Sequence, residues 1–355
     1  MTWRELLTAA GDKLKKSGIA EYEIDAWYLF SEAFGISRAE FFLCRDRESG
    51  ISVSDVCRNE NECEAASSLK TEKEASAQIK QLQEGQSQTD QSRETQFFRF
   101  RKMICLRSRR IPLQQITGHQ EFMGLDFLVN EHVLCPRQDT EVLVETVLSE
   151  LAEINVSRGT EASTAENKIW MQSGERALKP VERSARVVRI LDMCAGSGCI
   201  GISLERLSAT PVNVLAADIS DGAIKVAESN AKRLSCEHYE IVKSNLFEQI
   251  SGSFDVIVSN PPYIPSAVIE TLEDEVRLHE PRIALDGEAD GLTFYRKISE
   301  AAVDHLNLGG RIYYEIGYDQ GRAVSDILSE NGFIDIRVIR DLAGLDRVVA
   351  ARLPG

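Results

Sequence analysis

The stretch Val187–Leu207, VVRILDMCAGSGCIGISLERL, decides the fold class of this 355-residue chain. An apolar, β-branched run comes first, followed by a glycine-rich turn and then by apolar residues at helical spacing, which predicts strand, loop and helix. Gly196, Gly198 and Gly201 fit the spacing G-x-G-x-x-G, and Asp218 follows about 20 residues on, at the end of the next strand. This pattern is typical of an α/β fold whose glycine loop approaches a ligand, although the spacing alone does not select the ligand.

Strand-like runs recur along the chain from Val187 onward. They are Val187–Met193, Asn213–Asp218, Tyr239–Ser244, Phe254–Ser259, Gly310–Gly317, Phe333–Arg340 and Arg347–Leu353. Helical patterns separate most of them, and one such pattern covers Gln320–Asn331. Repeated alternation of strand and helix predicts an α/β fold with a doubly wound, mostly parallel, seven-stranded sheet.

The N-terminal part of the chain has a different pattern. Between Trp3 and Leu43 apolar residues recur at helical spacing, which predicts a small helical bundle. The residues that carry this pattern are Leu6, Leu7, Ala10, Leu14, Ala26, Leu29, Phe30 and Phe34. We therefore expect an N-terminal helical domain over residues 1–117, in which a polar stretch at about 46–95 forms a solvated insertion.

A hairpin and a second domain follow. Ile111–Glu131 alternates around Gly118 and Gly124, which predicts a β-hairpin linker over residues 118–138. The α/β domain then covers residues 139–355, and a second polar insertion lies at about 155–184. Its first helix is predicted at Asp139–Ile154, with an inward apolar stripe formed by Leu143, Val144, Val147, Leu148 and Leu151.

Charge and composition exclude several classes of protein. The formal net charge of −15 argues against a general electrostatic grip on nucleic acid, and we interpret the most basic stretch, Phe97–Arg110, as a solvated helix face. No run reaches the apolar length of a membrane span, and the N-terminus has no signal-peptide core, so we expect a cytoplasmic protein without a membrane partner. None of the eight cysteines forms a C-x-x-C pair, so no metal site is expected.

The run SNPPYIP at Ser259–Pro265 indicates chemistry at the end of a buried strand. The side-chain oxygen of Asn260 and the backbone carbonyl of Pro261 can each accept one N–H of a planar amide or amine nitrogen. These two acceptors would direct the nitrogen lone pair along the line to a methyl donor. Proline rigidity fixes the acceptors, and Tyr263 offers a flat apolar wall.

The residues before the glycine loop help to select the ligand. Asp192 gives the pattern D-x-x-x-G-x-G, which is typical of enzymes that use S-adenosylmethionine. An NAD enzyme has the same loop architecture but no need of N-P-P-Y at the fourth strand. The loop and the N-P-P-Y run together therefore favour a methyltransferase.

With these motifs the chain resembles the N5-glutamine methyltransferases that modify peptide chain release factors, the HemK or PrmC family. Further likeness lies in PLQQITGHQEFMGLDF, CPRQDTEVLVE, HEPRIALDGEADGLTFYRKI and LGGRIYYEIGYDQG. The resemblance implies a class I S-adenosylmethionine-dependent methyltransferase fold with a small N-terminal helical domain that docks the partner. It further implies methyl transfer from S-adenosyl-L-methionine to the glutamine of the Gly-Gly-Gln motif of class I release factors. Separately, we expect a monomer that does not bind nucleic acid directly.

The resemblance also assigns roles to residues. The cofactor site it implies consists of Cys194, Ala195, Gly196, Ser197, Gly198, Asp218, Asn245, Leu246 and Asn260. The substrate glutamine is held by Asn260, Pro261, Pro262 and Tyr263, of which Asn260, Pro261 and Tyr263 are the catalytic residues. Glu280, Pro281 and Asp290–Tyr295 are expected to shape the substrate mouth.

Four positions depart from the family pattern. Cys194 replaces a glycine, Asn245 replaces an aspartate near the adenine, Gln138 replaces a proline, and Glu288 interrupts a glycine pair. None of them belongs to the N-P-P-Y run, so we expect activity to be retained. Cofactor affinity is the property that these changes put in question.

Three other functions compete with this one. An adenine-N6 methyltransferase acting on DNA or RNA is the nearest alternative, because N-P-P-Y suits any planar amine, but the acidic balance counts against it. A non-catalytic cofactor-binding partner of the translation machinery is a second alternative, and the intact Asn260 and Tyr263 argue against it. An NAD-dependent dehydrogenase comes last, and bound NADH fluorescence would separate it from the methyltransferases.

Overall fold

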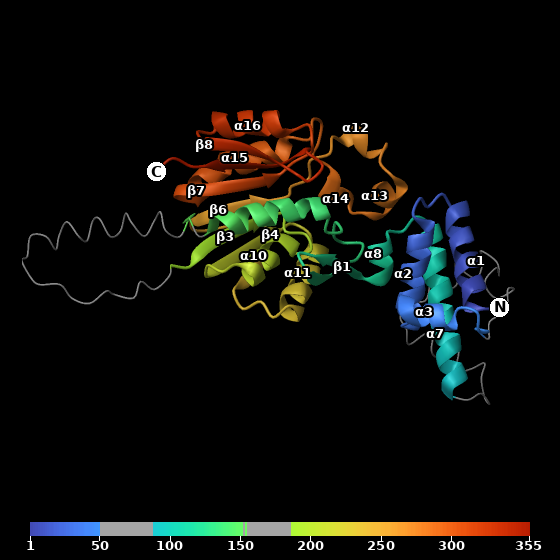
Figure 1. Ribbon diagram of the computed structural model, residues 1–355. Helices are drawn as coiled ribbons and strands as arrows, with labels where there is room; N and C mark the ends of the chain where they lie inside the picture. The colour runs from blue at the N-terminus through green and yellow to red at the C-terminus, as the bar shows by residue number, and fades with distance from the viewer. Residues whose placement is uncertain (50–87, 152, 155–185) are drawn as a thin grey trace, which may run out of the picture. The chain divides into compact units, whose positions relative to one another are not determined.

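Figure 1 shows the computed structural model of the chain, which describes residues 1–49, 88–151, 153–154 and 186–355. Most of the two predicted polar insertions therefore lies outside the described residues. Helix α7 (Gln88–Ser108) begins within the first insertion. The chain divides into two compact units, Met1–Thr117 and Gly118–Gly355. Among the residues described, no helix is long and apolar enough to cross a membrane.

The N-terminal unit is a helical bundle around one apolar core. Besides α7, it contains α1 (Trp3–Lys16), α2 (Tyr22–Phe34), α3 (Arg38–Cys44) and α8 (Leu113–Thr117). Capping boxes begin α1 and α3, in which Thr2 pairs with Glu5 and Ser37 with Glu40. The apolar residues predicted for the first two helices are buried, except for the half-buried Leu7, and the predicted bundle is confirmed.

Helix α7 corrects the interpretation of the basic stretch Phe97–Arg110. Phe100 and Ile104 are buried in the bundle core. Arg107 is also buried, and its Nε donates to a carboxylate oxygen of the buried Asp25 at 2.6 Å. The expectation of a solvated helix face therefore holds for Arg99 and Arg109, which are exposed, but not for Arg107. Apolar residues placed between the arginines at helical spacing draw this side of the helix into the core.

The second unit is built on a seven-stranded sheet. Its strands are β3 (Val188–Met193), β4 (Val212–Asp218), β5 (Tyr239–Lys243), β6 (Phe254–Ser259), β7 (Leu306–Glu315), β8 (Ile334–Arg340) and β9 (Asp346–Arg352). Their order is β5-β4-β3-β6-β7-β9-β8, and only the two pairs that contain β9 are antiparallel. This order confirms the predicted doubly wound sheet of a class I S-adenosylmethionine-dependent methyltransferase fold.

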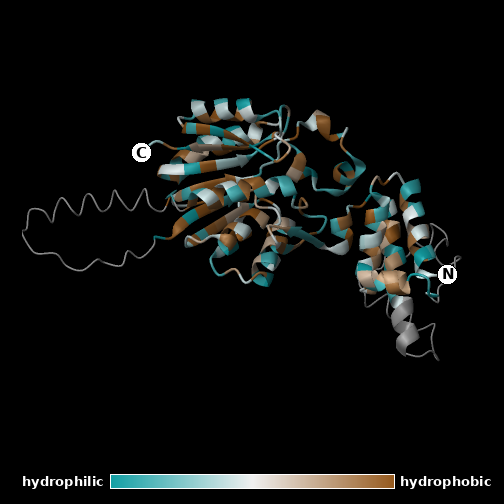
Figure 2. Cartoon of the chain, in the orientation of Figure 1, coloured by the Kyte–Doolittle hydropathy of each residue, from teal (hydrophilic) through white to brown (hydrophobic). Residues whose placement is uncertain are grey.

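Helices cover both faces of this sheet (Figure 1). Helical segment 138–151, α10 (Cys199–Leu207) and α11 (Asp221–Arg233) pack on one face, and α15 (Thr293–His305) and α16 (Gly321–Glu330) pack on the other. Three short helices lie in the connection between β6 and α15, namely α12 (Ser266–Ile269), α13 (Asp274–His279) and α14 (Arg282–Leu285). In Figure 2 the central strands are largely brown, as expected of strands that are buried on both faces.

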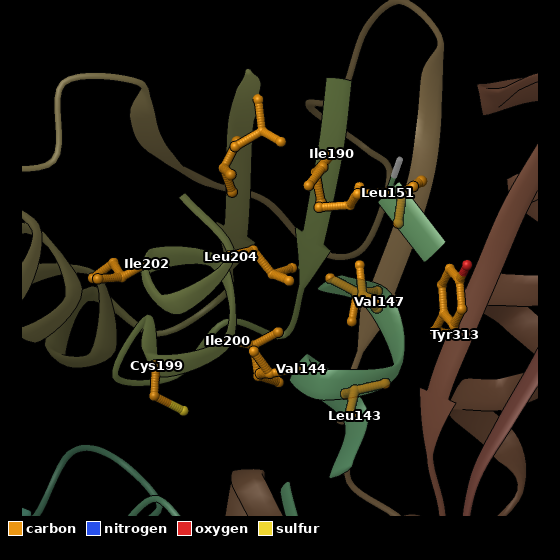
Figure 3. Close-up of a cluster of buried hydrophobic side chains, with 14 of the residues drawn as sticks. Leu143, Val144, Val147, Leu151, Ile190, Cys199, Ile200, Ile202, Leu204 and Tyr313 are labelled. Atoms are coloured by element: carbon orange, nitrogen blue, oxygen red, sulfur yellow. The ribbon is translucent and has the colours of Figure 1, made fainter. Parts of the chain in front are cut away.

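Figure 3 shows the core on the first face of the sheet. Leu143, Val147 and Leu151 of segment 138–151 pack there with Ile200 of α10 and Tyr313 of β7. The helix predicted at Asp139–Ile154 is confirmed, and its stripe faces inward except that Leu148 is half-buried. The segment therefore runs across the sheet, and its first turn comes near the carboxyl ends of the strands.

A hairpin opens the second unit. Strands β1 (His119–Phe122) and β2 (Leu125–Leu128) pair antiparallel around a two-residue turn. Met123 and Gly124 in this turn have φ of 53° and 71°, as a type I′ turn requires. The hairpin was predicted, but the alternation had also included Leu113–Thr117, which forms the short helix α8.

Candidate active site

A cavity of about 300 Å³ lies where the parallel strands of the sheet end. Its lining includes nine of the predicted site residues, namely Cys194, Ala195, Gly196, Ser197, Asp218, Asn245, Leu246, Asn260 and Pro262. Gly198, Pro261 and Tyr263 do not border it. The lining residues follow β3, β4, β5 and β6, which is the place where doubly wound sheets bind ligands, because the loops leaving neighbouring strands diverge there.

The glycine loop keeps a left-handed backbone at several positions. Gly196 and Gly198 have φ of 56° and 79°, and Cys194 has φ of 62°. A non-glycine residue in this region costs about 1–2 kcal/mol. Although Cys194 replaces the glycine of the family pattern, the backbone there keeps the left-handed conformation with a side chain present.

Asp192 stabilises the end of the glycine loop through a hydrogen bond with the first turn of α10. It is fully buried at the end of β3, and its Oδ2 accepts the backbone N–H of Gly201 at 2.9 Å. Its Oδ1 makes no hydrogen bond to any residue that the structure describes. Burial, opposed by the bond from Gly201 and assisted by the nearby charge of Asp218, raises the pKa of Asp192 to about 7. The carboxyl group thus anchors the first turn of α10.

Asp218 is the acidic group of the cavity. Its Oδ2 accepts the N–H of Gly196 and its Oδ1 accepts the N–H of Ser220, both at 2.9 Å. Burial nevertheless raises its pKa above the ordinary range for aspartate. Because each carboxylate oxygen has two lone pairs, the group retains acceptor capacity for a hydroxyl donor of a ligand besides its bonds to backbone N–H groups.

Asn245 and Leu246 form the wall of the cavity after β5. The Nδ2 of Asn245 donates to Glu248 Oε1 at 2.7 Å. This bond leaves the Oδ1 end of the amide as the group that can accept an N–H from a ligand. Asn245 therefore offers the same acceptor chemistry at this place as the aspartate expected there. Leu246 contributes apolar surface beside it.

The N-P-P-Y run leaves β6 at the rim of the cavity. All six residues of β6 are buried, and Asn260 follows directly after the strand. Asn260 and Pro262 line the cavity, whereas Pro261 is buried and Tyr263 is half-buried beside it. The run thus combines a half-buried acceptor that borders the cavity with rigid, buried prolines beside it.

The backbone of Tyr263 is held by the loop that precedes α15. The neighbouring Ile264 donates to Leu285 O at 3.0 Å and accepts from the N–H of Gly287 at 2.9 Å. A Cβ added to Gly287 would lie 2.8 Å from Tyr263 Cα, and a Cβ added to Gly291 would collide with the Tyr263 carbonyl. These glycines allow close approach of the loop to the N-P-P-Y run.

Two residues expected at a substrate mouth are buried instead. Glu280 accepts from Arg137 Nη2 at 2.5 Å, and burial raises its pKa. Tyr295 is fully buried, and its hydroxyl donates to the backbone carbonyl of Glu315 at 2.8 Å. Glu280 therefore contacts the cavity through Arg137, which lines it, and the helical spacing of α15 turns Tyr295 toward the sheet. Glu288, by contrast, lines the cavity.

Thr140 and Glu315 are two neighbours of Asn260 that the sequence analysis missed. Thr140 lines the cavity from the first turn of segment 138–151, and Glu315 is buried at the end of β7. Burial raises the pKa of Glu315 to about 7, while Thr140, the charge of Arg347 and the Asn260 side chain lower it. The signal in the sequence was a carboxylate ending an otherwise apolar strand, as Asp218 does.

Family models match both units of the chain. The PrmC N-terminal domain matches residues 5–52, and the methyltransferase small domain matches residues 173–274. The first match lies in the N-terminal part of the chain, and the second includes the glycine loop, Asp218 and the N-P-P-Y run.

Relatives of known name are similar over most of the chain. The release factor glutamine methyltransferase of Clostridium botulinum is 39% identical over 356 residues, which cover 99% of this chain and 99% of that protein. The enzyme of the same name from Geobacter sulfurreducens is 39% identical over 71% of this chain and 77% of that protein. A bifunctional methyltransferase of Rickettsia felis is 40% identical over 73% of this chain and 49% of that protein. The chain therefore belongs to the release factor glutamine methyltransferase family.

Proposed function

We propose that this protein transfers a methyl group from S-adenosyl-L-methionine to the side-chain amide nitrogen of the glutamine in the Gly-Gly-Gln motif of class I peptide chain release factors. One observation carries the proposal. Asn260 of the N-P-P-Y run borders the same cavity as the glycine loop and Asp218. The chain also shares 39% identity over 99% of its length with a protein named for this activity.

The residues of the cavity fit S-adenosylmethionine. Asp218 has acceptor capacity left for a ribose hydroxyl, and Asn245 Oδ1 can accept from the adenine amino group. Leu246 and the loop from Cys194 to Gly198 provide the apolar and backbone surface around them. When bound, the cofactor supplies an electrophilic methyl group on a sulfonium.

Asn260 and Pro261 orient the nitrogen that is methylated. An amide nitrogen is a weak nucleophile because its lone pair is delocalised, so alignment supplies most of the acceleration. Asn260 Oδ1 and the Pro261 carbonyl each accept one N–H, which directs the lone pair at the methyl carbon. The nitrogen–carbon bond forms as the carbon–sulfur bond breaks, and the nitrogen then loses a proton to solvent. Alignment of this kind is worth about 7–11 kcal/mol.

Pro262 and Tyr263 complete the substrate site in this proposal. The buried prolines keep the two acceptors fixed, and the Tyr263 ring gives the glutamine side chain an apolar support. The N-terminal domain, residues 1–117, recognises the release factor. We propose that the enzyme acts as a monomer in the cytoplasm, where its partner and cofactor occur.

An adenine-N6 methyltransferase is not favoured as an alternative. Relatives that are 39% identical are named for release factor glutamine. Two arginines of the basic stretch Phe97–Arg110 also pair with acidic side chains of the bundle. Arg107 pairs with Asp25 at 2.6 Å and Arg99 with Glu32 at 2.7 Å. Paired arginines contribute less to phosphate binding than arginines on an open surface.

The test is methylation of a purified, unmethylated class I release factor. The protein is incubated with S-adenosylmethionine, and the Gly-Gly-Gln peptide is analysed by mass spectrometry. We expect one added methyl group on that glutamine. The variant Asn260→Ala should leave the peptide unmodified, whereas Asn331→Ala, at the end of α16, should behave as the unchanged protein. Cofactor binding without methylation of the peptide by the unchanged protein would refute the substrate assignment.

A further inference from the structure

Asn260 and Glu315 occupy equivalent places on two neighbouring strands. Strands β6 and β7 are parallel, and Ser259 pairs with Tyr314 in their register. Asn260 and Glu315 are the next residues on each chain segment, so both lie at the carboxyl end of the sheet. In parallel strands, residues at matched positions point to the same face.

The alternation of side chains identifies that face. Tyr313 packs with segment 138–151, as Figure 3 shows, whereas the Tyr314 hydroxyl lies 3.0 Å from Ser299 Oγ of α15, on the other face. Glu315 therefore turns back toward segment 138–151. Val258 packs in the same cluster as Tyr313, so Asn260 turns to that side as well.

The Glu315 carboxyl is buried, and one of its two oxygens can still accept a hydrogen bond. It is only 2% exposed, and its Oε2 makes no hydrogen bond to any of the described residues. The donors beside it are the Thr140 hydroxyl and the side chain of Asn260, which both favour its ionised form. A buried carboxylate strongly attracts N–H and O–H groups, because leaving it unpaired is costly.

Charged and titratable groups face Glu315 from each element around it. They are Asp139 of segment 138–151, Arg347 of β9, Tyr263 after β6, Tyr295 of α15 and Cys199 of α10. Arg347 is the only cation among them, and it also pairs with Asp139 and Asp341 at 3.1 Å. Among the residues described, Glu315 therefore shares its nearest cation with two aspartates, and burial raises its pKa to about 7.

We propose that Glu315 is a positioning residue for the methyl transfer: its carboxylate accepts the side-chain N–H of Asn260 and so turns the Asn260 carbonyl oxygen toward the substrate nitrogen. The inference rests on the proposed function. The two ends of a carboxamide have nearly the same shape, so an asparagine without a fixed partner can present either end. An ionised carboxylate only accepts hydrogen bonds, which makes the correct orientation of Asn260 the favoured one.

Protonation of Glu315 removes this preference. A protonated carboxyl has an O–H donor, which can pair with the Asn260 oxygen and turn the NH₂ group toward the substrate. Two N–H groups would then face each other, and the lone pair of the glutamine nitrogen would lose its alignment. Activity should therefore require the ionised form, be full above the pKa of about 7 and fall as the pH drops through it.

The first experiment compares pH profiles of the turnover number kcat between pH 5.5 and 9, with saturating cofactor and release factor. The unchanged protein should lose activity below about pH 7. The variant Glu315→Gln should have a kcat about 10- to 100-fold lower at pH 8, which is the effect expected of one charge-assisted hydrogen bond. Its kcat should also show no acid limb, that is, no fall as the pH drops through about 7. Its KM for the release factor and its cofactor Kd should stay the same.

Glu150→Gln is the matched control. Glu150 is a buried glutamate that also lies beside β7, where it accepts from the Tyr313 hydroxyl at 2.8 Å and from Arg337 at 2.7 Å. This variant should keep the acid limb of the unchanged protein, even if its stability falls. An unchanged kcat and acid limb in Glu315→Gln would overturn the proposal. Equal losses of folding and cofactor binding in that variant would assign Glu315 a structural role instead.

A second measurement does not depend on catalysis. In protein labelled with ¹⁵N at asparagine, the Asn260 side-chain NH₂ resonance is assigned by its loss in Asn260→Ala. It should shift with pH around 7 in the unchanged protein and stay constant in Glu315→Gln. A resonance that is insensitive to pH would refute the contact with Glu315. A clear titration in a protein that fails to methylate the release factor would refute only the proposed function.

Discussion

Gln320 connects the start of α16 to Tyr263. Its Nε2 donates to the Tyr263 backbone carbonyl at 3.0 Å, and its Oε1 accepts the N–H of Gly317 at 3.0 Å. A single amide side chain therefore ties the turn after β7 to the N-P-P-Y run after β6. Gly291 packs against the same carbonyl, so the position of Tyr263 depends on a donor on one side and on the absence of a side chain on the other.

Replacing Gly291 with alanine should displace the N-P-P-Y run. Gly291 has φ of 73°, and an added Cβ would collide with the Tyr263 carbonyl and lie 2.9 Å from Gln320 Nε2. We expect a loss of about 3 kcal/mol in the free energy of unfolding, from left-handed strain and overpacking together. The methylation rate should fall about 100-fold, as expected of a displacement of about 1 Å at a reacting group.

Gly344→Ala is the control for the conformational part of this effect. Gly344 has φ of 80°, but an added Cβ would meet nothing within 4 Å. This variant should lose only about 1–2 kcal/mol in urea denaturation and should keep its methylation rate. Equal rates for the two variants would contradict the close packing of Gly291 on Tyr263.

Replacing Glu288 with glycine should stabilise the protein. Glu288 has φ of 67° and an exposed side chain, 3.9 Å from Lys297 in a weak surface pair. Glycine removes about 1–2 kcal/mol of left-handed strain from the folded state. It also makes the unfolded chain more flexible, which lowers the free energy of unfolding by about 0.4–1 kcal/mol. A net gain of about 0.5–1 kcal/mol in the free energy of unfolding remains. Urea denaturation measures the difference.

Glu288→Ala separates the backbone effect from the loss of the side chain. Alanine also lacks the contact with Lys297 but retains a Cβ, so it should not raise the stability. Equal stabilisation by alanine and glycine would show that the side chain, and not the backbone conformation, carries the cost.

The variant Asp218→Asn should weaken cofactor binding. Both carboxylate oxygens of Asp218 accept a backbone N–H, and an amide has only one acceptor oxygen. Losing a hydrogen bond to a charged group costs about 1.5–3 kcal/mol, which corresponds to roughly 10- to 150-fold weaker binding in isothermal titration. Asp221→Asn, at the start of α11, changes an exposed carboxylate that pairs with Lys243 and should leave the Kd unchanged. Equal values of Kd for both variants would contradict the role of Asp218.

Asp192 should make the stability of the protein depend on pH. Its folded pKa of about 7 lies above the unfolded value of about 3.9, so between these values the folded state holds a proton that the unfolded state has released. The unfolding free energy therefore falls as the pH rises from 4 to 7, by a few kcal/mol at most. Asp192→Asn keeps an acceptor for the Gly201 N–H and lacks this titration, so its stability relative to the unchanged protein should rise over the same window.

Denaturation at several pH values provides the measurement. Asp221→Asn is the control, because the Lys243 contact lowers the pKa of Asp221 and both states are ionised between pH 5 and 7. Its difference from the unchanged protein should therefore be constant over that range. Parallel curves for Asp192→Asn and the unchanged protein would exclude a raised pKa at Asp192.

Local patterns in the sequence determined the fold and most of the cavity. Strand and helix periodicity depends on neighbouring residues, so all seven strands and the inward stripe of segment 138–151 could be predicted. The glycine loop, Asp218 and Asn260 each follow a strand, and the carboxyl ends of parallel strands meet at one edge of a sheet. The sequence alone therefore predicts that these residues lie together.

Only the tertiary structure determined which buried residues contact the site residues at that edge of the sheet. Glu315 lies next to Asn260 because β6 and β7 are neighbours in register, a relationship that no local pattern contains. The burial of Tyr295 and Arg107 likewise depends on partners far away in the chain, Glu315 and Asp25. Local periodicity specifies which side of an element is apolar, but the contacts of a buried polar group depend on how distant segments pack.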